Sequence, residues 1–331
     1  MPNPRILFVK TSSLGDVVHN CPAVTDVARH VPGAVIDWVV EESFAEVVAL
    51  HPHVRRVIPV AIRRWRGAAL GAQTWSEFRA FRAALRSERY DAVIDSQGLI
   101  KSALIAAFAI GPKHGFDSAS MREPFAARLY GARHAVSAAL HAVERNRWLA
   151  AAALGYRAEG PCDYGLRVTS EPPAPGLATA SSSASPPYAV LLTMTSRDDK
   201  LWPEEHWRSL GGALANRGVH SVLPWGTEEE RHRCARIATA IPGAVVPRRM
   251  SLTELASLLR EARCVVGVDT GLAHLAAALD LPVVGLYCGS DPVLTGLHPG
   301  GLHGGNRVRS LGRRGAPPAV AEVLEVLEPL L

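Results

Sequence analysis

Short apolar runs alternate with longer stretches of helical spacing along most of the chain. In the N-terminal half, three such runs occur, at residues 5–9, 35–40 and 92–95. Short runs that are mostly apolar are typical of parallel strands that are buried on both faces. Apolar residues recur at helical spacing in the segments 101–109, 122–130 and 137–154. This alternation predicts a doubly wound parallel sheet.

The same alternation begins again after residue 187. Strands are expected at 188–192, 221–224, 244–246, 264–268 and 282–286, and helices at 204–217, 228–241, 252–260 and 272–279. The segment before this restart, 169–187, is rich in Pro and Ser and is predicted to be a linker. The pattern therefore predicts two α/β domains, 1–168 and 188–318, with a helix at 319–331. Ligands are expected beyond the carboxyl ends of the strands, in a cleft between the domains.

Composition narrows the class of protein. With 331 residues, 48% hydrophobic and 20% charged, the chain has enough apolar surface for two cores and is not a disordered protein. No apolar run approaches the ~20 residues of a membrane span, and no signal peptide is expected at the N-terminus. Five scattered cysteines without a C-x-x-C spacing indicate reduced thiols. We therefore expect a cytoplasmic protein.

Charge is distributed unevenly. Residues 1–168 hold 21 Lys and Arg against 15 Asp and Glu, whereas residues 169–331 hold 15 against 16. A basic N-terminal half favours an anionic partner, although an Arg-rich coding bias would produce the same balance. Of the 36 basic residues, 32 are Arg. The four lysines are therefore of interest, because a compact ammonium provides a point charge, which a planar guanidinium does not.

Several common catalytic signatures are absent from the sequence. It contains no G-x-G-x-x-G after the first strand and no G-x-x-x-x-G-K-[ST], which disfavours a dinucleotide enzyme and a P-loop NTPase. It also lacks G-x-S-x-G and H-E-x-x-H. The histidines form no cluster with metal-ligand spacing beyond His51-x-His53. No metal site is expected.

A polar loop, Thr11-Ser-Ser-Leu-Gly-Asp16, follows the first predicted strand and precedes a helix. Asp16 is either a cap of that helix or a general base at the end of the strand. Ser12, Ser13 and Gly15 are small enough for a substrate to approach closely. The sequence leaves both interpretations open.

Polar loops follow two predicted strands of the second domain as well. Asp269 comes directly after one strand and is either a helix cap or an acceptor of sugar hydroxyls. Thr195, Ser196 and Lys200 follow another strand. Hydroxyls and an ammonium at a strand end favour a diphosphate site, and an ordinary surface loop is the alternative. Glu228, after a further strand, is suited to the hydroxyls of a ribose.

The segment Arg63-Arg-Trp-Arg66 groups three guanidiniums around an aromatic ring. Guanidinium groups bind carboxylates and phosphates with two parallel hydrogen bonds. A solvated charged surface is the alternative.

Taken in order, these segments match a known family. Lys10-Thr-Ser-Ser-Leu-Gly-Asp16, Ala61-Ile-Arg-Arg-Trp-Arg66, Asp91-Ala-Val-Ile-Asp-Ser-Gln-Gly98, Arg197-Asp-Asp-Lys200-Leu-Trp-Pro and Val268-Asp-Thr-Gly-Leu-Ala-His274 resemble motifs of the bacterial lipopolysaccharide heptosyltransferases of glycosyltransferase family 9, with the type I branch matched most closely. The resemblance implies a GT-B fold, with two Rossmann-like domains facing a central cleft. It also implies a metal-free inverting transfer of L-glycero-D-manno-heptose from ADP-heptose to Kdo of the inner core.

Roles for individual residues follow from the resemblance. Asp16 corresponds to the general base, and Lys200 to a catalytic and donor-binding residue. The other donor contacts implied are Thr195, Ser196, Glu228, Met250, Asp269, Thr270, Gly271 and His274. The acceptor contacts implied are Ser12, Ser13, Arg63, Arg66 and Arg122. The first domain would hold the acceptor, Kdo2-lipid A, at the cytoplasmic face of the inner membrane, and neither a cofactor nor a nucleic acid is implied.

Three alternatives stay open. Heptosyltransferase II, or another sugar transferase of the same family, would share these motifs. A sugar-nucleotide epimerase of similar two-domain architecture would need no acceptor. A protein that only binds a nucleotide sugar would bind ADP without turnover.

Overall fold

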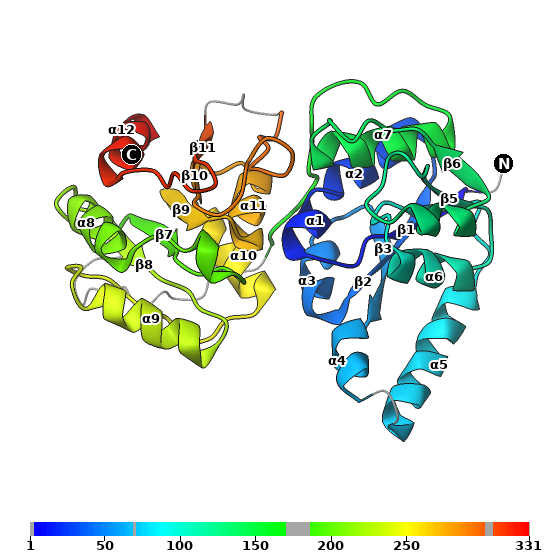
Figure 1. Cartoon of the computed structure of the whole chain (residues 1–331), viewed down its shortest axis with the longest axis horizontal. Helices are drawn as coiled ribbons and strands as arrows, with labels where there is room; N and C mark the ends of the chain where they lie inside the picture. Colours follow the sequence, from blue (N-terminus) through cyan, green and yellow to red (C-terminus); the bar gives the residue numbers. More distant parts are fainter. Residues whose placement is uncertain (1–2, 69–70, 170–185, 302–306, 331) are drawn as a thin grey trace. The chain divides into compact units, whose positions relative to one another are not determined.

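The structure is a computed structural model that describes residues 3–68, 71–169, 186–301 and 307–330. The chain divides into two compact units, Met1–Arg167 (unit 1) and Val168–Leu331 (unit 2), and each is a parallel sheet covered by helices (Figure 1). The predicted linker falls mostly on residues 170–185, which lie outside the described ranges. In the described ranges, no helix has both the length and the apolar character needed to cross a membrane.

Unit 1 contains a six-stranded sheet in the order β3-β2-β1-β4-β5-β6. Its strands are β1 Arg5–Val9, β2 Val35–Glu41, β3 Val54–Val60, β4 Ala92–Asp95, β5 Lys113–Phe116 and β6 Ala132–His134. Its α-helices are α1 Leu14–Val18, α2 Cys21–His30, α3 Ala45–Ala49, α4 Ile62–Gly67, α5 Ala72–Arg86, α6 Ile100–Phe108 and α7 Ala142–Leu154. Two 3-10 helices, η1 Glu42–Phe44 and η2 Pro124–Leu129, complete it.

Two predicted helices of unit 1 differ from the structure. The segment 122–130 forms η2, a 3-10 helix of six residues with Pro124 at its start. The helix expected from residue 137 begins at Ala142, where the His141 side chain accepts a hydrogen bond from the Val143 amide and caps it.

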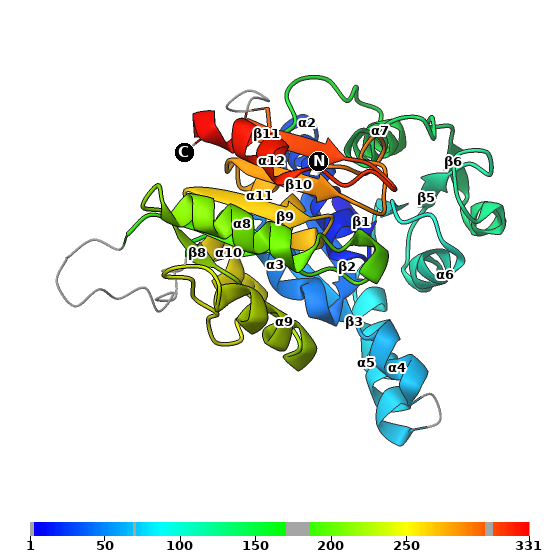
Figure 2. The same ribbon diagram turned by 60° about the vertical axis from the view of Figure 1, so that its left-hand side comes forward.

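The sheet of unit 1 is buried on both faces, as its apolar strands predict. Leu7 and Val9 of β1 pack on one face against side chains of α5 and α6, such as Leu85 and Ile105. Alternation along the strand directs Phe8 to the opposite face, where α2 and α7 lie (Figure 2). The burial of β1 on both sides fixes the position of the loop that follows it.

Unit 2 contains a five-stranded sheet in the order β11-β10-β9-β7-β8. Its strands are β7 Tyr188–Leu192, β8 His220–Val222, β9 Cys264–Val268, β10 Val283–Tyr287 and β11 Val308–Gly312. Its helices are α8 Glu204–Ala215, α9 Glu228–Ala238, α10 Leu252–Arg260, α11 Gly271–Ala278 and α12 Val320–Leu327, with 3-10 turns η3 Asp198–Lys200 and η5 Glu328–Leu330. The strand expected at 244–246 is reduced to a single bridge between Val245 and Val222.

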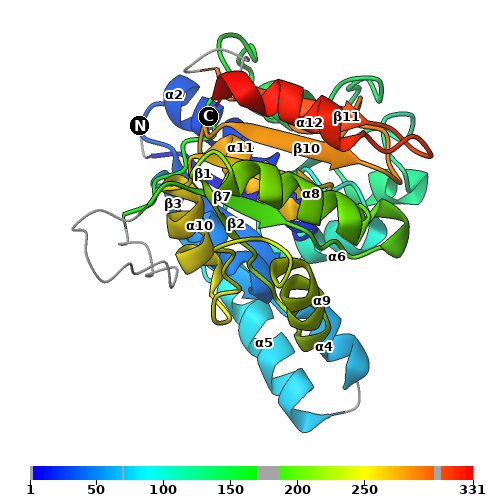
Figure 3. The ribbon, with the colours of Figure 1, turned by 90° about the vertical axis from the view of Figure 1, so that its left-hand side faces the viewer.

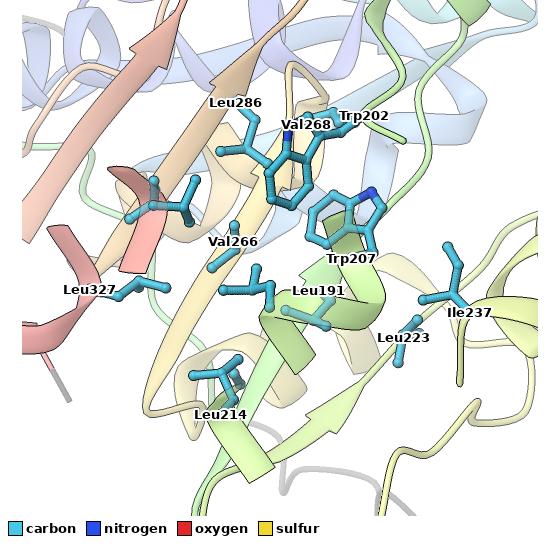
Figure 4. Close-up of a cluster of buried hydrophobic side chains, with 14 of the residues drawn as sticks. Leu191, Trp202, Trp207, Leu214, Leu223, Ile237, Val266, Val268, Leu286 and Leu327 are labelled. Carbon is cyan, nitrogen blue, oxygen red and sulfur yellow. The ribbon is translucent and has the colours of Figure 1, made fainter. Parts of the chain in front are cut away.

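The core of unit 2 fills the space between the sheet and helices α8, α9 and α12. Trp202 and Trp207 are fully buried, with ring centroids 5.0 Å apart, and lie over Val266 and Leu286 (Figure 4). Helices α10 and α11 cover the other face of the sheet (Figure 3). This packing brings the carboxyl ends of β7, β9 and β10 to one edge, because Leu192 pairs with Gly267 and Val268 with Leu286.

Candidate functional site

Asp16 lies in the first turn of α1, just beyond the loop that follows β1. Its Oδ2 accepts hydrogen bonds from the Ser13 amide (2.8 Å) and the Ser13 hydroxyl (3.1 Å). The carboxylate therefore caps the helix, as one interpretation of the sequence predicted. It is also partly exposed, and an ionised carboxylate has about four lone-pair sites. Capping thus leaves lone pairs available for a proton, and the general-base role stays a prediction.

The loop before Asp16 is held by Gln97, which follows β4. Gln97 Oε1 accepts hydrogen bonds from the amides of Thr11 (3.0 Å) and Ser12 (3.1 Å). Lys101 Nζ donates to Ser12 Oγ (3.2 Å). These contacts arise because β1 and β4 are neighbours in the sheet, with Val9 paired to Asp95. Gln97 is not among the site residues predicted from the sequence, because its only signal was its place in a loop after a strand.

Lys10 is buried beneath this loop. Its Nζ donates to the Ser96 carbonyl (2.8 Å), and its carbonyl accepts a hydrogen bond from Trp38 Nε1 (3.0 Å). Burial lowers the pKa of the Lys10 ammonium, and the negative charges of Asp16 and Asp95 oppose that shift. Lys10 thus lies within electrostatic reach of Asp16. The sequence singled it out only as one of four rare lysines.

The arginines predicted to bind the acceptor lie apart from this loop in sequence, on α4 and before η2. Arg64 is fully engaged, since it ion-pairs with both Glu42 (2.9 Å) and Glu77 (2.7 Å). Arg63 lies over the Phe44 ring, 5.3 Å from its centroid. Within the described ranges, neither Arg63 nor Arg66 forms an ion pair. Arg122 is exposed. Among the described residues, no hydrogen bond or ion pair joins these arginines to Asp16.

In unit 2, several residues of the predicted donor site contact Asp269. Its Oδ2 accepts hydrogen bonds from Lys200 Nζ (2.7 Å) and Ser290 Oγ (2.6 Å), and its Oδ1 lies 3.8 Å from His274 Nε2. Burial raises the pKa of the Asp269 carboxyl, but hydrogen bonds from His274, Lys200 and Ser290 outweigh burial and hold it well below its usual range. Asp269 is therefore ionised at neutral pH.

Three of the predicted donor contacts thus meet at Asp269. Thr195 Oγ1 donates to the Asp269 carbonyl (2.9 Å), and Lys200 and His274 approach the carboxylate from η3 and α11. Ser290, which follows β10, is a further member that the sequence analysis did not select. Its position at the carboxyl end of a strand was the signal that could have found it.

The start of α11 lies directly beside Asp269. Thr270 is the N-cap residue and Gly271 the first residue of the helix. The amides of a first helical turn have no intrahelical partner and carry a partial positive charge, which suits a phosphate group. Lys200 adds a full positive charge to the same region, because it contacts the side chain of the preceding residue, Asp269.

The remaining predicted donor contacts are not joined to Asp269 by any measured interaction. Ser196 is exposed in the loop after β7. Glu228 begins α9 and pairs with Arg231 (2.7 Å) in the same helix. Met250 precedes Ser251, the N-cap of α10. Within the described ranges, no group of three or more His, Cys, Asp or Glu side chains is placed to hold a metal ion.

Comparisons with known proteins identify the family. The model of glycosyltransferase family 9 (heptosyltransferase) matches residues 78–310. Lipopolysaccharide heptosyltransferase 1 of Escherichia coli (strain K12) is 48% identical over 294 residues, covering 88% of this chain and 90% of the relative. The structure of E. coli heptosyltransferase WaaC with ADP has a TM-score of 0.89 and 43% identity, covering 99% of this chain and 100% of the other.

A second structure of the E. coli enzyme, with ADP-2-deoxy-2-fluoro heptose, has a TM-score of 0.84 and 42% identity, covering 99% of this chain and 100% of the other. The two parallel-sheet units are therefore those of the GT-B fold, as the motifs predicted. The family match spans more than half of the chain, and the relatives match it over nearly their whole length. The chain therefore belongs to glycosyltransferase family 9, the heptosyltransferases, and is a glycosyltransferase.

Proposed function

We propose that the enzyme transfers L-glycero-D-manno-heptose from ADP-heptose to a Kdo residue of the lipopolysaccharide inner core, with Kdo2-lipid A as the acceptor. The observation that carries this proposal is the match over nearly the whole chain with a heptosyltransferase whose structure contains ADP. The side chains around Asp269 support it, since they combine an ammonium, hydroxyls and a helix N-terminus at one place. Unit 2 is accordingly the donor-binding domain and unit 1 the acceptor-binding domain of this proposal.

In the reaction we propose, Asp16 acts as the general base. The carboxylate accepts the proton of the acceptor hydroxyl while that oxygen attacks the anomeric carbon of the donor. The bond from that carbon to the ADP oxygen breaks at the same time, with inversion. Gln97 acts through the loop: it accepts hydrogen bonds from the amides of Thr11 and Ser12, and the next residue, Ser13, donates its amide to Asp16.

Negative charge grows on the departing ADP as this bond breaks. Lys200 and the amides at the start of α11 oppose that charge without reorganising, which is the most effective form of electrostatic stabilisation. Thr195 and Ser196 are assigned to the diphosphate, Glu228 to the ribose, and Met250 and His274 to further donor contacts. Asp269 orients the Lys200 ammonium through its 2.7 Å ion pair.

The acceptor is an anionic lipid, so we propose that the enzyme acts at the cytoplasmic face of the inner membrane. The excess of Lys and Arg in residues 1–168 favours contact with the carboxylates of Kdo and the phosphates of lipid A. Arg63, Arg66 and Arg122 are the residues assigned to those groups, together with the hydroxyls of Ser12 and Ser13.

One assay tests this function against its alternatives. The purified enzyme, ADP-heptose and Kdo2-lipid A should yield an acceptor whose mass is larger by one heptose. Turnover only on an acceptor that already carries heptose would make this a type II enzyme. Conversion of ADP-heptose without any acceptor would indicate an epimerase. Binding of ADP with no product under any of these conditions would indicate a protein that only binds the nucleotide sugar.

Replacing Arg63 or Arg66 by Ala should raise the KM for the acceptor about tenfold and leave the KM for ADP-heptose unchanged. The reason is that these guanidiniums, without an acidic partner in the described ranges, are available for the acceptor's anionic groups. The wild-type acceptor KM should also rise with added salt. Arg64→Ala is the control, because Arg64 is engaged by Glu42 and Glu77. Equal effects on both substrates would show that these arginines only stabilise the fold.

Replacing Gln97 by Ala should lower kcat about tenfold with little change in ADP affinity, because the Thr11 and Ser12 amides lose their acceptor and the Asp16 carboxylate is held less precisely. Steady-state kinetics and ADP titration measure the two effects. Gln73→Ala, which removes an exposed glutamine of α5, is the matched control. A loss of ADP affinity as large as the loss of kcat would contradict a positioning role.

A further inference from the structure

Four large apolar side chains of unit 1 are exposed on α6 and η2. They are Ile100 (42% exposed), Leu104 (49%), Phe125 (66%) and Leu129 (39%), and we call them the α6–η2 patch. They make up half of the large apolar side chains exposed in the part of the chain that the structure describes. Single exposed apolar residues are common, but a contiguous group of them marks an interaction surface.

The four side chains belong to one surface because α6 and η2 pack directly against each other. Ala103 of α6 contacts Ala126 of η2 and Tyr130, and all three are buried. The small alanines let the two helices approach closely. Ile100 and Leu104 are four residues apart and share one side of α6, next to the buried side that carries Ala103. The patch therefore lies on the solvent side of a shared seam (α6 is labelled in Figure 1).

Positive charge accompanies the patch. Residues 100–134, which run from the start of α6 to the end of β6, contain five Lys or Arg and two Asp or Glu. Both acids are already engaged in hydrogen bonds: Asp117 accepts from the Ser120 amide (2.9 Å) and Glu123 from the Ile100 amide (2.7 Å).

The arginines of this segment are placed to accompany an apolar contact. The Arg128 guanidinium lies over the Phe125 ring, 4.8 Å from its centroid, and Arg122 is exposed just before η2. Arginines beside exposed aromatic and aliphatic side chains are typical of surfaces that lie at the boundary of an anionic lipid bilayer, where the apolar groups insert and the cations stay at the headgroups.

The patch is also joined to the loop that carries Asp16. Helix α6 begins two residues after Gly98, directly beyond the segment in which Gln97 holds the loop. Lys101, in the first turn of α6, contacts Ser12 Oγ (3.2 Å). A membrane contacting α6 would therefore lie close to the position where a lipid-linked sugar must meet Asp16.

We propose that the α6–η2 patch docks the enzyme on anionic phospholipid membranes, with Leu104 and Phe125 entering the boundary between headgroups and acyl chains. This inference rests on the proposed function in one respect: a lipid-anchored acceptor is what makes docking useful. The occupant is the lipid surface and not a protein, because cations border the apolar group, outnumber the acids of the segment, and the two acids are engaged in local hydrogen bonds.

Co-sedimentation with vesicles tests the docking directly. The probe is a vesicle of phosphatidylcholine with phosphatidylglycerol, compared with phosphatidylcholine alone. The wild type should prefer the anionic vesicles, and the variant Leu104→Ser/Phe125→Ser should lose binding at least about tenfold. Trp148→Ser is the matched control, because Trp148 is 53% exposed on α7, which covers the opposite face of the sheet. The control should bind like the wild type.

Turnover on two acceptors separates docking from catalysis. For Kdo2-lipid A in anionic vesicles, the double variant should lose kcat/KM in proportion to its loss of vesicle binding. For the fully deacylated, water-soluble acceptor, it should match the wild type. If the wild type transfers heptose to neither acceptor, the proposed function fails, while the sedimentation result still decides the docking.

Several results would overturn the docking proposal. They are a wild type that does not bind anionic vesicles, a double variant that binds as well as the wild type, and an equal loss of binding in Trp148→Ser. A concentration-dependent dimer in sedimentation velocity that the double variant abolishes would assign the patch to a second copy of the chain, and would also overturn it.

Discussion

Asp16→Asn should abolish heptose transfer, with a loss of about 10²–10⁴-fold in kcat, while ADP affinity stays within a few-fold of the wild type. Asn keeps the size of the side chain, and its amide oxygen can still accept the Ser13 amide that Asp16 Oδ2 accepts at 2.8 Å. What Asn lacks is the ability to take a proton from the acceptor hydroxyl. Single-turnover kinetics with saturating ADP-heptose, together with ADP titration, measure both quantities.

Ser13→Ala is the control for this substitution. It removes the hydroxyl that donates to Asp16 (3.1 Å) but keeps the backbone amide and the carboxylate, so it weakens the helix cap and removes one proposed acceptor contact while leaving the base in place. We expect it to lower kcat by less than about tenfold. If Asp16→Asn retained more than a tenth of the wild-type rate, or if Ser13→Ala were as severe, the role of Asp16 would be to cap α1.

Lys200→Ala should lower kcat about 10²–10³-fold with a smaller effect on the KM for ADP-heptose. The charge opposite Lys200 increases as the donor bond breaks, so its loss is felt most in the transition state. Lys200→Arg should recover only part of the rate, because a planar fork replaces a point charge that now contacts Asp269 at 2.7 Å. Activity should also persist in EDTA, since the sequence around the donor loop offers no D-x-D pair.

The matched control is Ser290→Ala. Ser290 and Lys200 donate to the same oxygen of Asp269, so this variant perturbs the carboxylate without removing a positive charge. We expect a loss of less than about tenfold. Equal losses in Lys200→Ala and Ser290→Ala would make Lys200 a partner of Asp269 and no more. Complete inactivation by EDTA with recovery in Mg²⁺ would contradict a metal-free reaction. Asp198 and Asp199 would then be the residues to test as metal ligands.

The apolar pattern predicted β1, β2 and β4 of unit 1 and β7 to β10 of unit 2, but not β3, β5, β6 or β11. In unit 1 it missed β3, because Arg55 and Arg56 interrupt the apolar run. The structure explains these charges: both arginines ion-pair with Asp37 of the neighbouring strand, β2. Strands β5 and β6 are short and contain Lys113, His114, Arg133 and His134, so neither forms an apolar run. An ion pair between strands is a tertiary contact that no local pattern contains.

Part of the site could be predicted from the rule that ligands bind at the carboxyl ends of parallel strands. That rule placed Thr195, Lys200 and Asp269 at ends of parallel strands, and the structure brings them into contact. It could not rank Gln97 or Ser290, whose importance lies in which distant atoms they touch. The sequence also left Asp16 as either a helix cap or a general base. The structure shows the cap and does not test the base.

The contacts that hold the Asp16 loop join residues 85 to 89 positions apart in the chain. Closing a loop of that length is entropically unfavourable and happens only once β4 has added to β1. The first hundred residues must therefore be synthesised before the segment around Asp16 can adopt its final conformation, although it lies near the N-terminus. The conformation of this part of the molecule thus depends on long-range pairing, and mutations that weaken the β1–β4 pairing will act on it from a distance.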